Sequence, residues 1–150
     1  MAETRKSLLE HFGKVRAELM ASIEGLSDAQ MMETTVDGWS VKDNLAHIAC
    51  WDDLRADEVT RMSAGHASAL LMTPEQNDVF NDMMYQLRRE WSLVQTRWEL
   101  RHSRQRLLDA IAAADPRAFD PSLYGEAGLL TTHDAQHAEY ITNWRRRLGY

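Results

Sequence analysis

The chain has 150 residues and a formal net charge of −6, and 44% of its residues are hydrophobic. This is typical of one globular domain spanning residues 1–150. The acidic balance argues against a dedicated nucleic-acid-binding protein, and no apolar stretch has the length of a membrane span or the form of a signal peptide. Cys50 is the only cysteine, which excludes an internal disulfide and leads us to expect a cytoplasmic protein.

Residues that favour helices dominate, and the chain contains only three prolines and seven glycines. The first predicted helix covers residues 3–24 and ends before Gly25, a typical C-terminal stop. Its apolar residues recur at spacings of three and four, which places them on one face. They are Leu8, Leu9, Phe12, Val15, Leu19 and Ile23.

The second predicted helix covers residues 41–64. Ser40 is the expected N-cap, and Asp43, three residues later, completes a variant of the capping box. A connection over residues 65–73 follows the helix. The apolar face carries Val41, Leu45, Ile48, Trp51, Val59 and Met62.

A third helical pattern runs over residues 74–114, with Thr73 as its cap and Pro74 in its first turn. This length exceeds that of a usual single helix, so we expect a kink or break within residues 85–91. Asp115-Pro116 ends the pattern. Its predicted core residues are Trp91, Val94, Trp98, Leu107, Leu108 and Ile111.

The last predicted helix begins between residues 126 and 132 and ends near Leu148. Arg145, Arg146 and Arg147 would complement the dipole at its C-terminus. The four predicted segments indicate an all-α four-helix bundle, mostly antiparallel between neighbours. One face of this last helix carries Leu130, His133, His137, Ile141, Trp144 and Leu148.

His133 and His137 are four residues apart on that apolar face, so both imidazoles point into the bundle, one turn from each other. Buried rings need polar partners, and a shared metal ion would satisfy both. The alternative is a pair of core histidines hydrogen-bonded to their neighbours. His47, beside the apolar face of the second helix, can reach the same point if the two helices adjoin.

Several nearby residues have two interpretations. Asp43 either orients His47 or only caps its helix, and Cys50 lies near the site or is a small core residue. Trp39 and Trp51 either form the wall of a pocket or pack in the core. We expect Asp134 to be solvated, because it lies about 100° from His133 around the helix. The sequence assigns no catalytic residue. Outside the site we expect His66 in a loop, His11 at the edge of the core and His102 in solvent.

Two segments resemble signatures of the DinB superfamily. The first is GWSVKDNLAHI at residues 38–48, and the second is HDAQH at residues 133–137, followed by Ile141 and Trp144-Arg145. The resemblance implies a DinB-like four-helix bundle and a metal triad of His47, His133 and His137. Within the superfamily, the C-terminal segment resembles the branch related to the colibactin self-resistance protein.

Three neutral imidazoles leave at least one coordination position open, as in catalytic metal sites. The expected cofactor is a divalent ion, and nickel, zinc and iron(II) all suit imidazole ligands. With the resemblance, this predicts a metal-dependent hydrolase or thiol S-transferase acting on small molecules in detoxification or stress response. The partners would be a small-molecule substrate and a low-molecular-weight thiol, and the resemblance adds a homodimer. The alternatives are a metal-containing binding protein without turnover and a helical interaction module without an ion.

Overall fold

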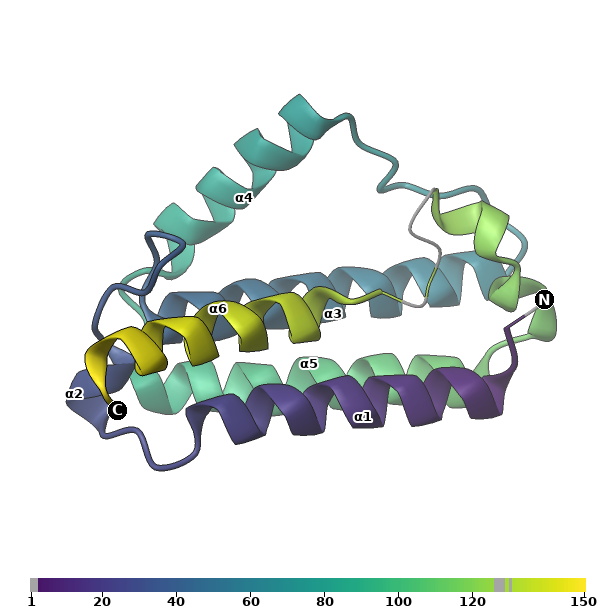
Figure 1. The fold of residues 1–150 in the computed structure, drawn as a ribbon. Coiled ribbons are helices and arrows are strands. Elements are labelled where there is room, and N and C mark those ends of the chain that lie inside the picture. The colour runs from purple at the N-terminus through teal and green to yellow at the C-terminus, as the bar shows by residue number, and fades with distance from the viewer. Residues whose placement is uncertain (1–2, 126–128, 130) are drawn as a thin grey trace.

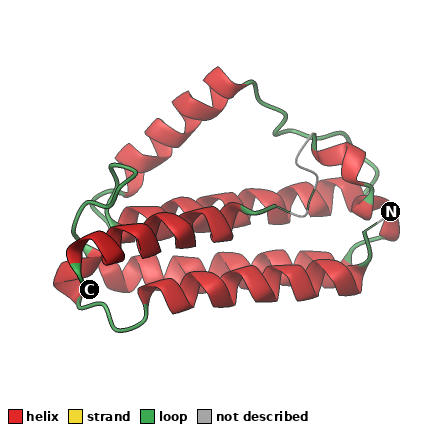
Figure 2. Ribbon diagram, viewed as in Figure 1, coloured by secondary structure: helices red, strands yellow, loops and turns green. Residues whose placement is uncertain are grey.

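The computed structural model describes residues 3–125, 129 and 131–150, and within them every regular element is helical (Figure 2). The all-α prediction is therefore confirmed. The elements, in chain order, are α1 (Arg5–Ile23), α2 (Asp28–Met31), α3 (Val41–Ser63), α4 (Pro74–Arg88), α5 (Leu93–Ala113), the short 3-10 helices η1 (Pro116–Phe119) and η2 (Pro121–Tyr124), and α6 (His133–Leu148).

Four long helices, α1, α3, α5 and α6, lie side by side as a bundle, whereas α4 leans away from it (Figure 1). Two apolar clusters form the core. One joins Leu8 and Phe12 of α1 to Val59 of α3, and the other joins Leu45 of α3 to Ile141 of α6. Charged and histidine side chains lie between the two clusters, so a polar layer crosses the middle of the bundle.

The predicted antiparallel arrangement holds for only some neighbours. α3 runs antiparallel to α6, and α1 to α5, but the most extensively packed pairs, α3 with α5 and α1 with α6, run parallel (Figure 1). The parallel pairs arise because the chain returns between α3 and α5 through α4. Lys42, at the start of α3, accordingly donates to the carbonyls of Arg89 and Trp91, just before α5 begins.

The helical pattern over residues 74–114 forms two helices, and its break falls in the predicted region. α4 ends at Arg88, and Ser92 then caps α5 by accepting a hydrogen bond from the Gln95 amide at 3.1 Å. The predicted caps Ser40 and Thr73 each form a capping box. Gly25 follows α1 with a φ of 79°, which a residue with a side chain rarely adopts.

Some predicted core positions are wrong. Val94 is 77% exposed and Trp98 is 51% exposed, because the break after α4 restarts the helical register and turns this part of α5 outward. Leu148, in the last turn of α6, is also exposed. Leu107 and Ile111 are fully buried, as expected. Leu130 lies outside the described residues, and α6 begins at His133, one residue after the expected range.

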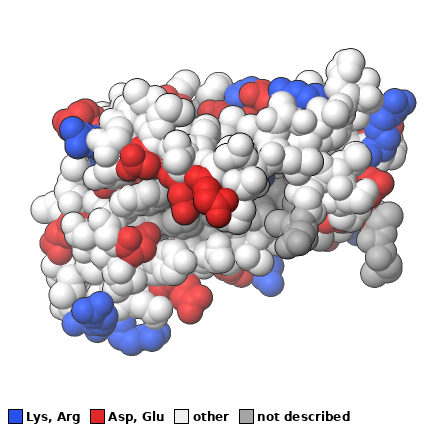
Figure 3. All heavy atoms as spheres, turned by 90° about the horizontal axis from the view of Figure 1, so that it is seen from above, with Lys and Arg blue, Asp and Glu red and all other residues white. Residues whose placement is uncertain are grey.

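The distribution of charged side chains on the surface agrees with the acidic composition of the chain. Seen from above, over α4, the described part of this face mixes acidic and basic side chains and has no continuous basic patch (Figure 3). Among the helices described here, none combines the length and apolar character needed to cross a membrane.

Candidate metal centre

The structure brings together the three histidines that the sequence singles out. His47 lies in the second turn of α3, and His133 and His137 lie in the first two turns of α6. Their ring centroids are 4.8 to 5.0 Å apart, and one ligand nitrogen from each ring lies within 4.8 Å of the others. The Nε2 atoms of His47 and His133 are 2.8 Å apart.

Asn44 fixes the orientation and tautomer of His137. Its side-chain amide nitrogen lies 2.9 Å from the Ser40 carbonyl, which can only accept a hydrogen bond, and 3.4 Å from Asp37 Oδ1. The Asn44 oxygen therefore faces His137 Nδ1, which must donate to it. This leaves Nε2 of His137 unprotonated, with its lone pair free to bind a cation.

Burial keeps the three imidazoles neutral. It lowers the pKa of His47 from 6.5 to about 3, with smaller contributions from the charges of His137 and Arg55. It also lowers the pKa of His133, assisted by Arg55 and the other two histidines, and that of His137. Neutral rings offer lone pairs at physiological pH, the form in which histidine binds metal ions.

The site contains a polar atom without a partner. Among the described residues, Nδ1 of His133 is buried and makes no hydrogen bond. Its Nε2 lies opposite that of His47. Two neutral rings can adopt this arrangement when the Nε2–H of one donates to the Nε2 of the other, or when both nitrogens bind a cation. Three converging imidazole nitrogens and one fixed tautomer therefore fit a metal ion.

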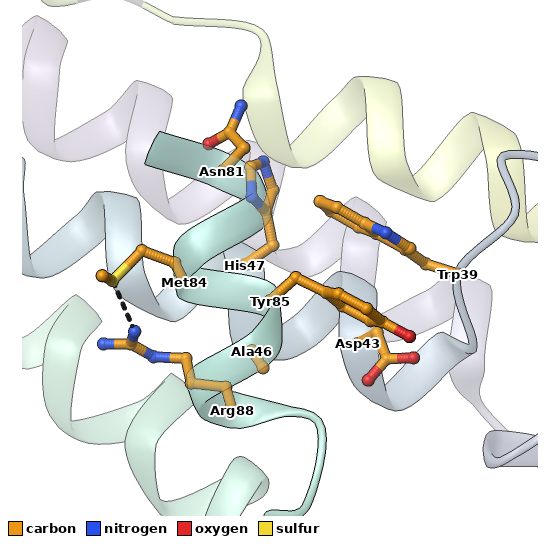
Figure 4. A pocket seen from close by; sticks show the side chains of 8 residues that line it. All are labelled: Trp39, Asp43, Ala46, His47, Asn81, Met84, Tyr85 and Arg88. Atoms are coloured by element: carbon orange, nitrogen blue, oxygen red, sulfur yellow. Dashed lines mark hydrogen bonds between the residues drawn. The ribbon is translucent and has the colours of Figure 1, made fainter. Parts of the chain in front are cut away.

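Aromatic side chains cover the α4 side of His47 (Figure 4). The Trp39 ring lies 5.0 Å from that of His47 and stacks on Tyr85 of α4 at 5.6 Å. The pocket that these residues line with Asn81 has a volume of only about 10 Å³, which is space for about one water. This side of the triad excludes bulk solvent and is too small for an organic substrate.

A larger cavity, of about 560 Å³, is lined by neighbours of the triad and not by the three histidines themselves. Trp51 lines it one turn after His47, and the two rings are 6.5 Å apart. Thr131 lines it too, and its hydroxyl accepts a hydrogen bond from the His133 amide at 3.1 Å. The cavity falls within the size range of small-molecule sites.

The prediction that Asp134 is solvated is wrong. Asp134 is 2% exposed and accepts hydrogen bonds from Arg16 at 2.7 Å and from Arg104 at 2.9 Å. Both arginines also bind Asp52, which is fully buried on α3. This ion-pair network joins four helices beside the triad and anchors the N-terminus of α6.

The structure decides the other two-way interpretations. The carboxylate of Asp43 bonds to the amide and hydroxyl of Ser40, so this residue caps α3. Asn44, its neighbour, contacts His137 of the triad, a role that the sequence analysis did not assign to it. Cys50 is buried, 4% exposed. Trp39 lines the small pocket and Trp51 the larger cavity.

The remaining histidines lie away from the triad, as predicted. His11 is half-buried at the edge of the core and contacts the Thr131 carbonyl at 2.7 Å. His66 is exposed in the connection before α4, and His102 is exposed and stacks on Trp98.

Comparison with known proteins identifies the family and supports the fold. The model of the DinB superfamily matches residues 11–141. No curated protein sequence matches the chain. One similar solved structure is the crystal structure of an uncharacterised protein from Escherichia coli UTI89, with a TM-score of 0.76 and 16% sequence identity. The match covers 97% of this chain and 95% of that one, so the two share a fold.

Proposed function

We propose that this chain, which belongs to the DinB superfamily, is a single-domain metal-dependent enzyme that activates a water or a small thiol for attack on an electrophilic small molecule. His47, His133 and His137 would hold the ion. Such an ion supplies Lewis acidity and favours the deprotonated form of a bound thiol or water. A role in detoxification or stress response fits this chemistry.

The observation that carries the proposal is the placement of three neutral imidazoles beside a cavity of about 560 Å³. A closed structural site would need four protein ligands. In the described part of the chain, the cluster of residues able to hold a metal contains three, all of them histidines. A position is thus left for a reactant, and the cavity provides space for the rest of that molecule.

The chain's own residues would prepare the site. Asn44 holds His137 in one tautomer, and the low pKa of His47 keeps its lone pair available. Trp39 and Tyr85 exclude bulk water from the α4 side. A hydrolase would use water as the nucleophile and an S-transferase a thiol, and both place the electrophile in the cavity.

The first test is metal binding. Purified, chelator-treated protein would be titrated with nickel, zinc and iron(II) by calorimetry. We expect one ion per chain in the wild type and loss of binding in His133→Ala. His66→Ala, which removes an exposed histidine far from the triad, is the matched control and should bind like the wild type.

The second test is turnover. The metal-loaded protein would be assayed for conjugation of cysteine, glutathione, mycothiol and bacillithiol to a chloronitrobenzene, and for hydrolysis of nitrophenyl esters. We expect one of the two reactions to depend on both the metal and His133. Metal binding without turnover across both panels would instead support the metal-containing binding protein.

A further inference from the structure

The large cavity beside the triad has a mainly apolar wall and a cationic group. It lies between the second half of α3, the connection leading to α4, and described residues that precede α6, among them Leu129 and Thr131. Its charged lining residues are Arg55 and Glu58 of α3. Its apolar lining residues are Trp51, Leu70, Leu71, Met72, Pro74 and Leu129.

The ion-pair network beside this cavity has an excess of positive charge. Arg16 binds Asp52 and Asp134, each at 2.7 Å. Arg104 binds the same two carboxylates at 3.0 and 2.9 Å. Adding Arg55, which is 3.7 Å from Asp52, makes three guanidinium groups for two carboxylates. One positive charge is left without a matching anion.

That excess charge reaches the cavity through Arg55, because its half-buried side chain lines the cavity. Arg55 Nη1 is buried, and no hydrogen-bond acceptor lies within reach in the residues that the structure describes. Asp52 does not satisfy it, because Asp52 Oδ1 lies 3.7 Å from Arg55 Nη1, too far for a hydrogen bond. The network therefore leaves part of the hydrogen-bonding capacity of the Arg55 guanidinium unused, and an anion in the cavity can use it.

Glu58, the carboxylate in the same cavity, is already engaged elsewhere. Its oxygens accept hydrogen bonds from Arg61, from the Ser68 hydroxyl and from the Ala69 amide. The ion pair of Glu58 is with Arg61, one turn along α3. Glu58 therefore holds the connection after α3 against that helix, and its carboxylate is not available to pair with Arg55.

We propose that Arg55 is the anchor of a carboxylate subsite, and that the substrate is an organic monoanion with an apolar body. The planar guanidinium matches the two oxygens of a carboxylate. A single unmatched positive charge favours one negative charge over the two of a phosphate monoester. The apolar walls would hold the rest of the molecule. This deepens the proposed function, because the same cavity flanks the triad, and it places the anionic end at Arg55.

The test uses 4-phenylbutyrate as the probe and the neutral 4-phenylbutanamide as its isostere. Binding to chelator-treated protein is measured by calorimetry and by perturbation of tryptophan fluorescence, since Trp51 lines the cavity. We expect the carboxylate to bind at least tenfold more tightly than the amide. Equal affinities, or no binding of either probe, would overturn the proposal without any variant being needed.

Variants then locate the anion. Arg55→Met should lose at least tenfold in carboxylate affinity and leave the affinity for the amide unchanged, and Arg55→Lys should retain part of the preference. The control is Arg106→Met, because Arg106 pairs with Asp53 and Asp57 outside the cavity lining. Equal losses in the Arg55 and Arg106 variants would contradict a subsite at Arg55.

The experiment is independent of the metal. Chelator-treated wild type should show the preference for the carboxylate whether or not the triad can bind an ion. A protein that binds metal but shows no carboxylate preference would refute the subsite alone. A protein that shows the carboxylate preference but binds no metal would refute the metal centre alone.

Discussion

Two polar clusters lie side by side inside this bundle, and they differ in how well their atoms are satisfied. In the first, Asp52 and Asp134 are held by Arg16 and Arg104 through hydrogen bonds of 2.7 to 3.2 Å. In the second, the triad, His133 has a buried Nδ1 atom without a partner among the described residues. The two carboxylates are buried and saturated with donors, whereas the triad has one buried and two half-buried histidines and is not saturated.

The difference indicates a difference in role. A saturated buried network joins helices and fixes their packing, since removing one partner leaves an uncompensated charge. A cluster of neutral rings with free lone pairs contributes little to the packing of the metal-free chain and is suited to bind something else. Arg55 shares features of both, because it forms an ion pair with the network, has one unsatisfied N–H and lines the large cavity.

The largest expected effect is on the network. Asp52→Ala leaves three buried or half-buried arginines facing one carboxylate, and should lower the free energy of unfolding by about 3–5 kcal/mol. Urea denaturation followed by circular dichroism measures this. Asp57→Ala, which removes an exposed partner of Arg106, should change stability by less than about 0.5 kcal/mol. Equal effects at the two positions would mean that the buried pairs do not hold the bundle together.

The second expected effect is the response of the metal-free protein to pH. The folded-state pKa of His47 is about 3 and its unfolded value about 6.5, so the unfolded state binds the proton more readily. Stability is then fully present above pH 6.5 and is lost as the pH falls towards 3. Between pH 7 and pH 5 this histidine alone accounts for about 2 kcal/mol.

Urea denaturation at pH 7, 6 and 5 in the presence of a chelator checks this pH response. His47→Gln should be less sensitive to pH over that range, because the variant lacks the group that the unfolded state protonates. An unchanged slope in the variant would show that His47 is not held neutral by burial. Asp57→Ala serves as the control and should keep the slope of the wild type.

The contrast between the triad and the ion-pair network also explains which features could be predicted from the sequence. The triad was predictable because His133 and His137 lie on one apolar stripe and His47 beside another, so each residue carries its own local signal. The capping roles of Ser40 and Thr73 are equally local. The break between α4 and α5 was predictable from length alone, within a few residues.

The ion-pair network was not predictable, because its partners come from helices that are far apart in the sequence. Asp134 is one residue from His133, and helical periodicity places it off the apolar stripe. Its burial depends on Arg16 and Arg104, which come from helices distant in sequence. The parallel pairing of α3 with α5 was missed for a similar reason, since it depends on the path of α4 outside the bundle.

The third expected effect concerns Asn44, the residue that orients His137. Asn44→Ala removes the acceptor from His137 Nδ1 and frees the ring to adopt the other tautomer. Loss of such a supporting contact typically lowers metal affinity 10–100-fold, and we expect a decrease of about that size for nickel or zinc. Calorimetric titration of the chelator-treated variant measures it. An affinity equal to that of the wild type would show that the tautomer is set elsewhere.

The smallest expected effect is at Asp43, the neighbour of Asn44, and it separates capping from metal binding. Asp43→Ala breaks the capping box with Ser40 and should lower the free energy of unfolding by about 1 kcal/mol. Its metal affinity should equal that of the wild type, because the side chain hydrogen-bonds Ser40 and not a histidine. A fall in metal affinity comparable to that of Asn44→Ala would mean that the start of α3, rather than one amide, positions the triad. Asp43 and Asn44 would then position the triad together, and helix capping and histidine orientation could not be assigned to separate side chains.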